Sequence, residues 1–268
     1  MKKVFLFLCT ALVGIISLNS CLEGSNESSG QAVGVYSAYG SKNFSPVFFS
    51  TIGNVYAPNM PNNFTDQKCY YIAYSYSADV PENSAAMVEL NGYSTITMTA
   101  FVPIADYYLK SSLTDTTIVL DNELPLVSGY EAGGSAYVQN YLFMTHVIKI
   151  PANTVLNWDI SCNYSTMPTV ENDKRYYDLF VRATKTTEGN NTGEVDTSVL
   201  NAYYVGSFLQ NAAQREMSLL GNSYSAGTSK FTLRINYVSD ISEDSKLTWK
   251  SATEENLLIY EFLPTTEY

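Results

Sequence analysis

The chain of 268 residues is predicted to be all-β, with two β domains. Apolar residues recur with period two in nearly every apolar stretch, and these stretches end at turn residues, as strands do. The 22 tyrosines fit strands that keep one side in water. The composition shifts at residues 120–135, where Pro and Gly accumulate and suggest a domain boundary. The prediction is a smaller domain at 35–124 and a larger one at 125–268.

The clearest strand of the N-terminal half is the segment CYYIAYSYS at 69–77, whose side chains divide between two faces. A turn-rich cluster follows it. Residues 86–99 are then predicted to be a strand pair with its turn at Asn91-Gly92, because this dipeptide favours the positive φ of hairpin turns.

The C-terminal half contains a series of short apolar segments that are predicted to be strands: 137–150, 155–163, 176–184, 230–238 and 257–263. In 230–238 the odd-numbered apolar residues are expected to face inward, and Lys230, Thr232, Arg234 and Asn236 to face water. Residues 206–220 are the best helix candidate, because apolar residues recur there about once per turn, although a strand followed by a loop is an alternative. Residues 105–113 are too short and too rich in Tyr for a convincing helix.

The first residues form a bacterial lipoprotein signal. A basic start, Met1-Lys2-Lys3, precedes an apolar run that ends at Leu18-Asn19-Ser20-Cys21. Leu three positions before a Cys and a small residue directly before it match the lipobox, which predicts cleavage after residue 20 and a lipid on Cys21. The apolar run is too short to span a bilayer comfortably. Residues 1–20 are therefore assigned to the signal peptide and 21–34 to a flexible tether rich in Gly and Ser.

The charge balance limits the partners. Cleavage after residue 20 removes two lysines and no acidic residue, which moves the formal net charge from −11 to −13. Phosphates of nucleic acids repel such a chain, and no basic cluster assists membrane binding, so attachment depends on the lipid. The expected location is the outer membrane, with the cell surface and the periplasmic face both open.

Cys69 and Cys162 are the two cysteines outside the signal peptide and the lipidation site. In an oxidising envelope they can form a disulfide, and the alternative is two buried thiols inside strands. Two distant cysteines and one histidine lack the spacing of a metal site, so no metal or cofactor is expected.

Catalytic motifs are not found in the sequence. His146 is the single histidine that a Ser/His/Asp system could use, and a structural role in a strand is the favoured interpretation. Glycoside hydrolysis needs two carboxylates, for which Asp159 and Asp178 in predicted strands are candidates. Outward-facing strand residues are the simpler interpretation of both. The protein is therefore predicted not to be an enzyme.

Aromatic residues are the most interesting candidates for ligand binding, because sugars stack on Tyr and Trp rings. Three platforms are possible: Tyr70, Tyr74 and Tyr76 along one strand, Tyr107-Tyr108 in a loop, and Trp249 near the C-terminus. The alternative is that these rings fill the core or pair across strands.

The sequence resembles the NigD-like lipoproteins of gut anaerobes. Besides Cys21, the segment FTDQKC at 64–69 resembles the family's Asp-Gly-x-Arg entry to a strand, with Gln67 and Lys68 in place of Gly and Arg. The segments at 140–148 and 177–182 are similar to two strands of the family's second domain. The resemblance implies an OB-like N-terminal barrel followed by a β-sandwich, and it implies no catalytic residues.

These observations together predict a non-catalytic lipoprotein of the cell envelope with a binding or interaction role. Its partner is an unknown protein or a polysaccharide. One alternative is a surface glycan-binding lipoprotein that uses Tyr or Trp platforms. Another is a fimbrial-type subunit that donates its apolar terminal strand, residues 257–263, to a neighbouring subunit.

Overall fold

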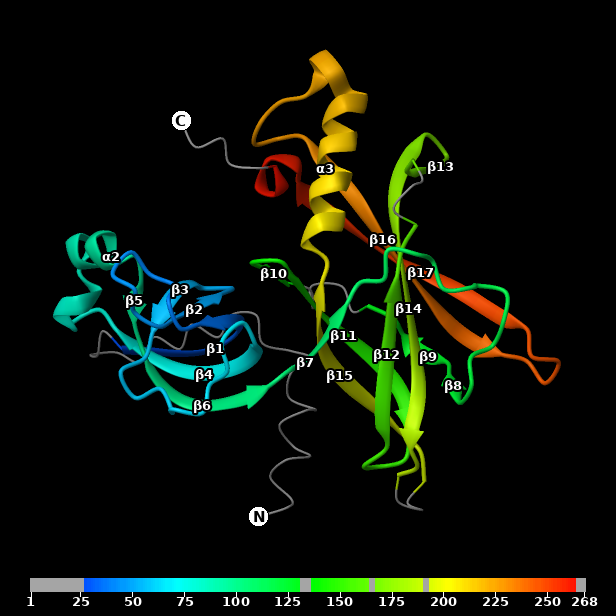
Figure 1. Ribbon diagram of the computed structural model, residues 1–268, viewed down its shortest axis with the longest axis horizontal. Coiled ribbons are helices and arrows are strands. Elements are labelled where there is room, and N and C mark those ends of the chain that lie inside the picture. Colours follow the sequence, from blue (N-terminus) through cyan, green and yellow to red (C-terminus); the bar gives the residue numbers. More distant parts are fainter. Residues whose placement is uncertain (1–26, 131–135, 164–166, 190–192, 264–268) are drawn as a thin grey trace. The chain divides into compact units, whose positions relative to one another are not determined.

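A computed structural model describes residues 27–130, 136–163, 167–189 and 193–263. The chain divides into two compact units (Figure 1). The first comprises the residues up to Asp106 together with Ala136–Phe143, and the second comprises Tyr107–Ser135 and Met144–Tyr268. Strands dominate both units, so the all-β prediction is confirmed.

The first unit is built on a six-stranded sheet in the order β5-β3-β2-β1-β4-β6. Its elements are β1 (Glu27–Ser37), β2 (Val47–Ser50), β3 (Gly53–Tyr56), β4 (Cys69–Ser77), the 3-10 turn η2 (Pro81–Asn83), α2 (Ala85–Asn91), β5 (Ser94–Thr95) and β6 (Thr97–Pro103). The short strand β10 (Ala136–Val138) also belongs to this unit. The predicted strand at 69–77 is confirmed as β4.

Aromatic rings fill the core of the first unit. Phe64 lies 4.4 Å from Tyr70, 4.8 Å from Phe101 and 5.5 Å from Phe48, measured between ring centroids. Aliphatic side chains such as Ile72 pack into the same cluster. Tilted and edge-on ring contacts of this kind stabilise a core beyond the area that they bury.

Two predictions for this unit are wrong. Residues 27–34 of the predicted tether belong to β1, which pairs with β4 from Glu27 to Val35, so ladder hydrogen bonds hold them in the sheet. Residues 85–91 form a helix rather than a strand. Gly92, at φ +82°, ends that helix and donates its backbone N–H to the carbonyl of Val88, so its left-handed conformation serves a helix C-cap.

The second unit contains two sheets. One has the path β11-β15-β7, with β9 paired to β11, and the strand β10 that extends this sheet belongs to the first unit. The other has the path β12-β14-β16-β17, with β8 and β13 paired to β14. The elements are β7 (Ala105–Tyr108), β8 (Glu123–Leu124), β9 (Leu126–Ser128), β11 (Tyr141–Ile150), β12 (Val155–Ser161), β13 (Thr169–Glu171), β14 (Lys174–Thr187), β15 (Val195–Tyr204), α3 (Gly206–Leu220), η3 (Gly221–Ser223), β16 (Lys230–Ile241), β17 (Leu247–Leu258) and η4 (Ile259–Phe262). The unit boundary cuts β7 after Asp106 and β11 after Phe143.

Side chains from both sheets meet inside the second unit, as in a β-sandwich. The ring of His146 on β11 stacks on that of Trp158 on β12 at 4.5 Å. The inward face of β16 is buried as predicted, whereas Arg234 and Asn236, which were expected to face water, are largely buried by contacts with β14.

The predicted helix at 206–220 is confirmed as α3, whose buried face includes Phe208, Leu209 and Ala212. By contrast, residues 257–263 do not form a terminal strand. Residues 257 and 258 end β17, and the chain then turns into η4, which packs against α3 and buries Ile259 and Phe262. A segment held in this way is not available to a neighbouring subunit.

The predicted domain ranges, 35–124 and 125–268, place the boundary inside the second unit. β8 and β9, which flank residue 125, pair with β14 and β11. Pro125 therefore lies between two short strands of the second unit.

Candidate functional site

The signal peptide, residues 1–20, and the lipidation residue Cys21 lie outside the described residues. Cys69 and Cys162 are both free and buried, so the possible disulfide between them is not formed. Burial raises the pKa of each thiol to about 12. Protonated thiols of this kind are poor nucleophiles, and the alternative interpretation of two buried structural cysteines fits the structure.

His146 is fully buried between the two sheets of the second unit. Its Nδ1 lies 2.6 Å from the carbonyl oxygen of Gly129, which can only accept, so Nδ1 carries the proton. Its Nε2 lies 2.7 Å from the hydroxyl of Tyr203, which donates to it and accepts a hydrogen bond from Asn201. Burial lowers the pKa of His146 to about 4, and the bond to Gly129 opposes this only in part. The ring is neutral and structural.

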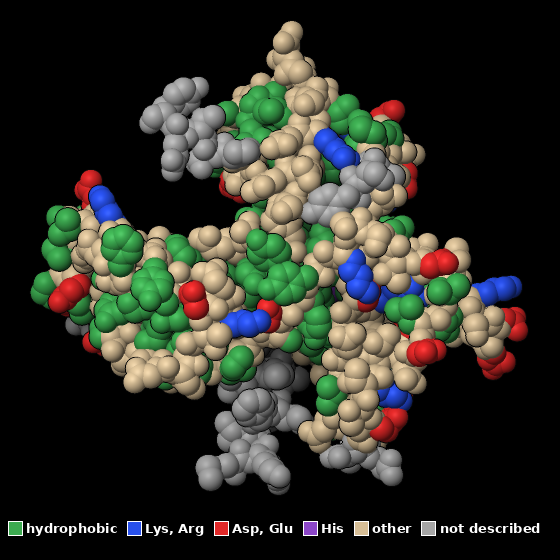
Figure 2. Space-filling view, viewed as in Figure 1, with side chains coloured by type: hydrophobic (Ala, Val, Ile, Leu, Met, Phe, Trp, Pro, Cys, Tyr) green, Lys and Arg blue, Asp and Glu red, His purple; other side chains and the backbone are tan. Residues whose placement is uncertain are grey.

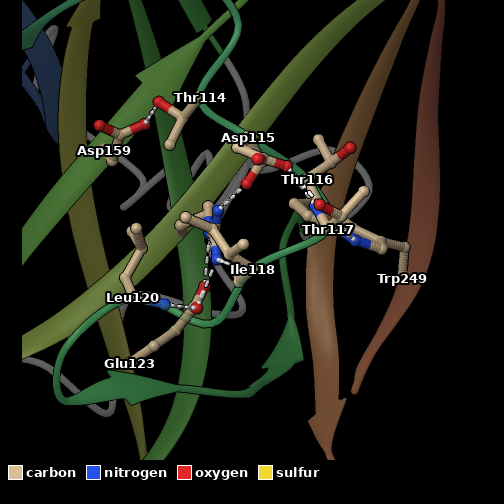
Figure 3. Close-up of polar contacts among 10 residues, drawn as sticks. Thr114, Asp115, Thr116, Thr117, Ile118, Leu120, Glu123, Asp159 and Trp249 are labelled. Atoms are coloured by element: carbon tan, nitrogen blue, oxygen red, sulfur yellow. Dashed lines mark hydrogen bonds and ion pairs between the residues drawn. The ribbon is translucent and has the colours of Figure 1, made fainter. Parts of the chain in front are cut away.

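Asp159 and Trp249, two residues that the sequence offered for function, instead hold the loop between β7 and β8 (Figure 3). Asp159 pairs with Lys110 and accepts a 2.9 Å hydrogen bond from the hydroxyl of Thr114. The indole N–H of Trp249 donates to the carbonyl of Thr116 at 3.1 Å. A half-buried ring with this partner is part of the packing rather than an open platform.

The buried ion pair between Arg182 and Glu123 also holds this loop. Arg182 and Glu123 have side chains that are 0% exposed, and two hydrogen bonds of 2.5 and 2.6 Å join them. Arg182 also donates to the carbonyls of Asp115 and Ile118. Because these buried groups are satisfied by one another, they hold the loop without an unpaired buried charge.

Asp178 is likewise engaged. Arg234 binds its carboxylate through two nitrogens, Thr169 donates to Oδ2 at 2.6 Å and Asn236 donates to Oδ1 at 2.7 Å. Asp159 and Asp178 are strand residues, as the sequence predicted, but cations on neighbouring segments cover both carboxylates. Neither carboxylate is presented as a free general acid or base.

The first aromatic platform does not form. Tyr70 is buried, and Tyr74 and Tyr76 pack against the core of the first unit. The ring of Tyr74 lies across Gly30 on β1, where an added Cβ would come within 2.7 Å of the hydroxyl. A larger residue at position 30 would therefore have to displace the ring of Tyr74.

The second platform forms in part. On the neighbouring strands β7 and β15, Tyr107 pairs with Tyr203, and Tyr108 with Tyr204. Tyr203 is buried, whereas the side chains of Tyr108 and Tyr204 are 65% and 36% exposed. Consecutive residues of a strand face opposite sides, so one tyrosine pair points into the sandwich and the other points outward.

A groove runs along α3 in the second unit. It offers about 200 Å³ between α3 and the β13–β14 hairpin, and its lining combines the rings of Tyr176, Phe180 and Phe208 with polar side chains. A second hollow continues along α3 and shares Met167, Asn211 and Arg215 with the first. β12 pairs with β14 only as far as Phe180 and β13 only from Tyr176, so 177–179 lack a partner strand on this edge in the described part of the chain.

Sequence reasoning missed both Tyr204 and this groove. The doublet Tyr203-Tyr204 repeats the doublet Tyr107-Tyr108, and this repetition was a usable signal for two tyrosine pairs on neighbouring strands. The groove depends on the packing of α3 against a hairpin distant in sequence, and it left no local signal.

The described residues contain no cluster of three or more His, Cys, Asp or Glu side chains that could hold a metal ion. Among the same residues, no helix is both long enough and apolar enough to span a bilayer.

Comparisons with known proteins place these features in context. Residues 24–102 match the family model of the lipoprotein OB domain. No curated protein matches the chain. An uncharacterised protein from Parabacteroides merdae ATCC 43184 has a similar structure, with a TM-score of 0.68 and 21% identity over 84% of this chain and 98% of that one.

Two other solved structures are more distant. A candidate lipoprotein from Bacteroides fragilis NCTC 9343 gives a TM-score of 0.52 and 14% identity, over 85% of this chain and 98% of that one. A NigD-like immunity protein from Bacteroides caccae ATCC 43185 gives a TM-score of 0.44 and 9% identity, over 85% and 97%. The family match confirms the OB-like N-terminal domain that the resemblance predicted. The chain is thus an all-β protein of two domains, the first of which matches the lipoprotein OB domain.

Proposed function

We propose that the protein is a non-catalytic lipoprotein of the cell envelope, anchored to the outer membrane through Cys21, that binds a partner with its second unit. The observation that carries the proposal is the match of residues 24–102 to the lipoprotein OB domain, which begins three residues after the lipobox cysteine. A structure with the same fold is described as a candidate lipoprotein.

The anchor and the first strand are close in sequence. β1 begins at Glu27, six residues after Cys21, so the connection spans at most about 20 Å even when fully extended. The first unit therefore stays near the lipid surface, and the acidic chain remains attached through the lipid rather than through charge.

A binding role is supported by the structural contacts that engage the side chains capable of chemistry. The histidine, the two cysteines and the two strand carboxylates that sequence offered for chemistry are buried or engaged in structural contacts. The second unit instead presents two surfaces for a ligand: the groove along α3 and the exposed pair Tyr108–Tyr204. The partner is a protein or a polysaccharide, and the acidic balance disfavours nucleic acid.

The anchoring is tested with Cys21→Ala in a bacterium that processes lipoproteins. The variant is expected to lose both labelling by a fatty-acid analogue and recovery with the membrane fraction. Cys9→Ala, which changes the other cysteine of this N-terminal segment, is the matched control and is expected to keep both. Labelling of Cys21→Ala at the wild-type level would refute the anchor.

A glycan-binding lipoprotein is the second candidate function. The exposed tyrosine pair favours it specifically, because the rings offer stacking faces next to polar side chains.

A further inference from the structure

We infer that Tyr108 and Tyr204 form a stacking platform for a neutral saccharide, which names the ligand class of the proposed binding function and rests on it. The two ring centroids are 5.5 Å apart and the ring planes are tilted by 45°. Both rings come from the second unit, so the platform is complete within it.

The platform has a fixed base. On the opposite face of the same two strands, Tyr107 and Tyr203 pair at 5.8 Å, and the hydroxyl of Tyr203 is held by His146 and Asn201 inside the sandwich. The backbone N–H of Leu109 donates to the carbonyl of Tyr204, which keeps the segment after β7 beside β15. Rings on paired strands lose little conformational freedom when a ligand binds.

Lys110, which is close to Tyr108 in sequence, carries its charge in an ion pair. Lys110 lies two residues after Tyr108, about 7 Å along an extended chain, and its side chain is 57% exposed. Its ammonium group pairs with Asp159, which also accepts from Thr114. The charge of Lys110 is therefore balanced by that of Asp159.

The size of the aromatic surface argues for a small ring-shaped ligand. At the observed exposures the two side chains offer on the order of 250 Å². A stable protein interface needs about 800 Å² on each partner. On the face that Figure 2 presents, hydrophobic side chains form separate patches among polar atoms rather than one broad apolar surface.

The net charge of the chain narrows the class of saccharide further. The chain carries a formal net charge of −11. Acidic polysaccharides are therefore repelled at long range. A neutral sugar, whose C–H face stacks on a ring, fits this restriction.

The experiment is calorimetric titration of the full lipidated protein in detergent with neutral oligosaccharides of glucose, galactose, mannose and xylose. Wild type is expected to bind at least one series. Tyr108→Ala and Tyr204→Ala are each expected to weaken that binding at least tenfold with an unchanged melting temperature. Tyr108→Phe, which keeps the ring, is expected to stay within about threefold of wild type.

Tyr260 provides the matched control, since it is an exposed tyrosine of the same unit that lies on η4, and Tyr260→Ala is expected to bind like wild type. Failure of wild type to bind any series would overturn the inference, as would full binding by both alanine variants. Loss of binding in Asn211→Ala alone would assign the ligand to the groove along α3 instead. Cys21→Ala is expected to bind the saccharide like wild type. The proposed lipid anchor and the proposed saccharide platform can therefore be refuted independently.

Discussion

The two units achieve stability with different interiors. The first is filled by aromatic and aliphatic side chains, with Phe64 at the centre of a ring cluster. The second buries a complete ion pair, Arg182–Glu123, and a neutral histidine between its sheets. An apolar core tolerates changes in pH and charge, whereas buried polar groups must keep every partner.

This difference shows where function can reside. In the second unit the side chains with the most reactive chemistry are the ones that the fold itself uses, so substituting them changes stability first. The proposed ligand binding is therefore assigned to outward-facing residues such as Tyr108 and Tyr204, or to the groove along α3.

The largest expected effect comes from Arg182→Met. It leaves Glu123 charged and buried without its partner, and it frees two loop carbonyls, so the second unit should lose about 3–5 kcal/mol. Hydrogen exchange resolved by segment should show faster exchange in the second unit and little change in β1 and β4. Lys174→Met, which removes an exposed pair with Glu255, is the control and should cost under about 0.5 kcal/mol. An equal loss of unfolding free energy in Arg182→Met and Lys174→Met would contradict the importance of the buried ion pair.

The next effect is a dependence on pH. The pKa of His146 is about 4 in the folded protein and 6.5 ordinarily, so between these values the unfolded chain binds the additional proton. The contribution to stability is fully present above pH 6.5 and is lost as the pH falls to about 4, by about 3 kcal/mol in total. Denaturant titrations between pH 7 and pH 4 should show a smaller loss for His146→Gln than for wild type. Parallel curves would mean that His146 is not responsible.

The smallest effect concerns a turn of the first unit. Gln67 has φ +59° and is the third residue of the turn 65–68, which the N–H of Lys68 closes onto the carbonyl of Thr65. Glycine adopts this conformation more readily, so Gln67→Gly should stabilise the first unit by about 0.5 kcal/mol. Thermal unfolding checks the sign, and a lower melting temperature would show that the Gln67 side chain makes an important contact.

Local patterns predicted much of the fold. The strand at 69–77 and the helix at 206–220 follow from periodicity alone. The helix at 85–91 was missed because a glycine with positive φ ends helices as well as hairpins. The terminal segment was assigned wrongly because its contact with α3 outweighs its strand-like composition.

The candidate site was harder to predict, because exposure is decided by contacts between distant residues. Trp249 was a reasonable candidate from sequence, but its indole N–H donates to the carbonyl of Thr116, which is 133 residues away in sequence. Tyr108 was identified, but its neighbour Tyr204 was not, since strand pairing and not sequence proximity brings the rings together. Local sequence reports which side chains can bind a sugar, and the sheet determines which of them remain open.

Hydrogen exchange of the full protein, with and without a saturating neutral oligosaccharide, tests the central claim most directly. The account predicts that the ligand slows exchange in β7 and in the C-terminal half of β15, while the OB domain is unchanged. Protection confined to β1–β6, or to α3 and the β13–β14 hairpin, would contradict it.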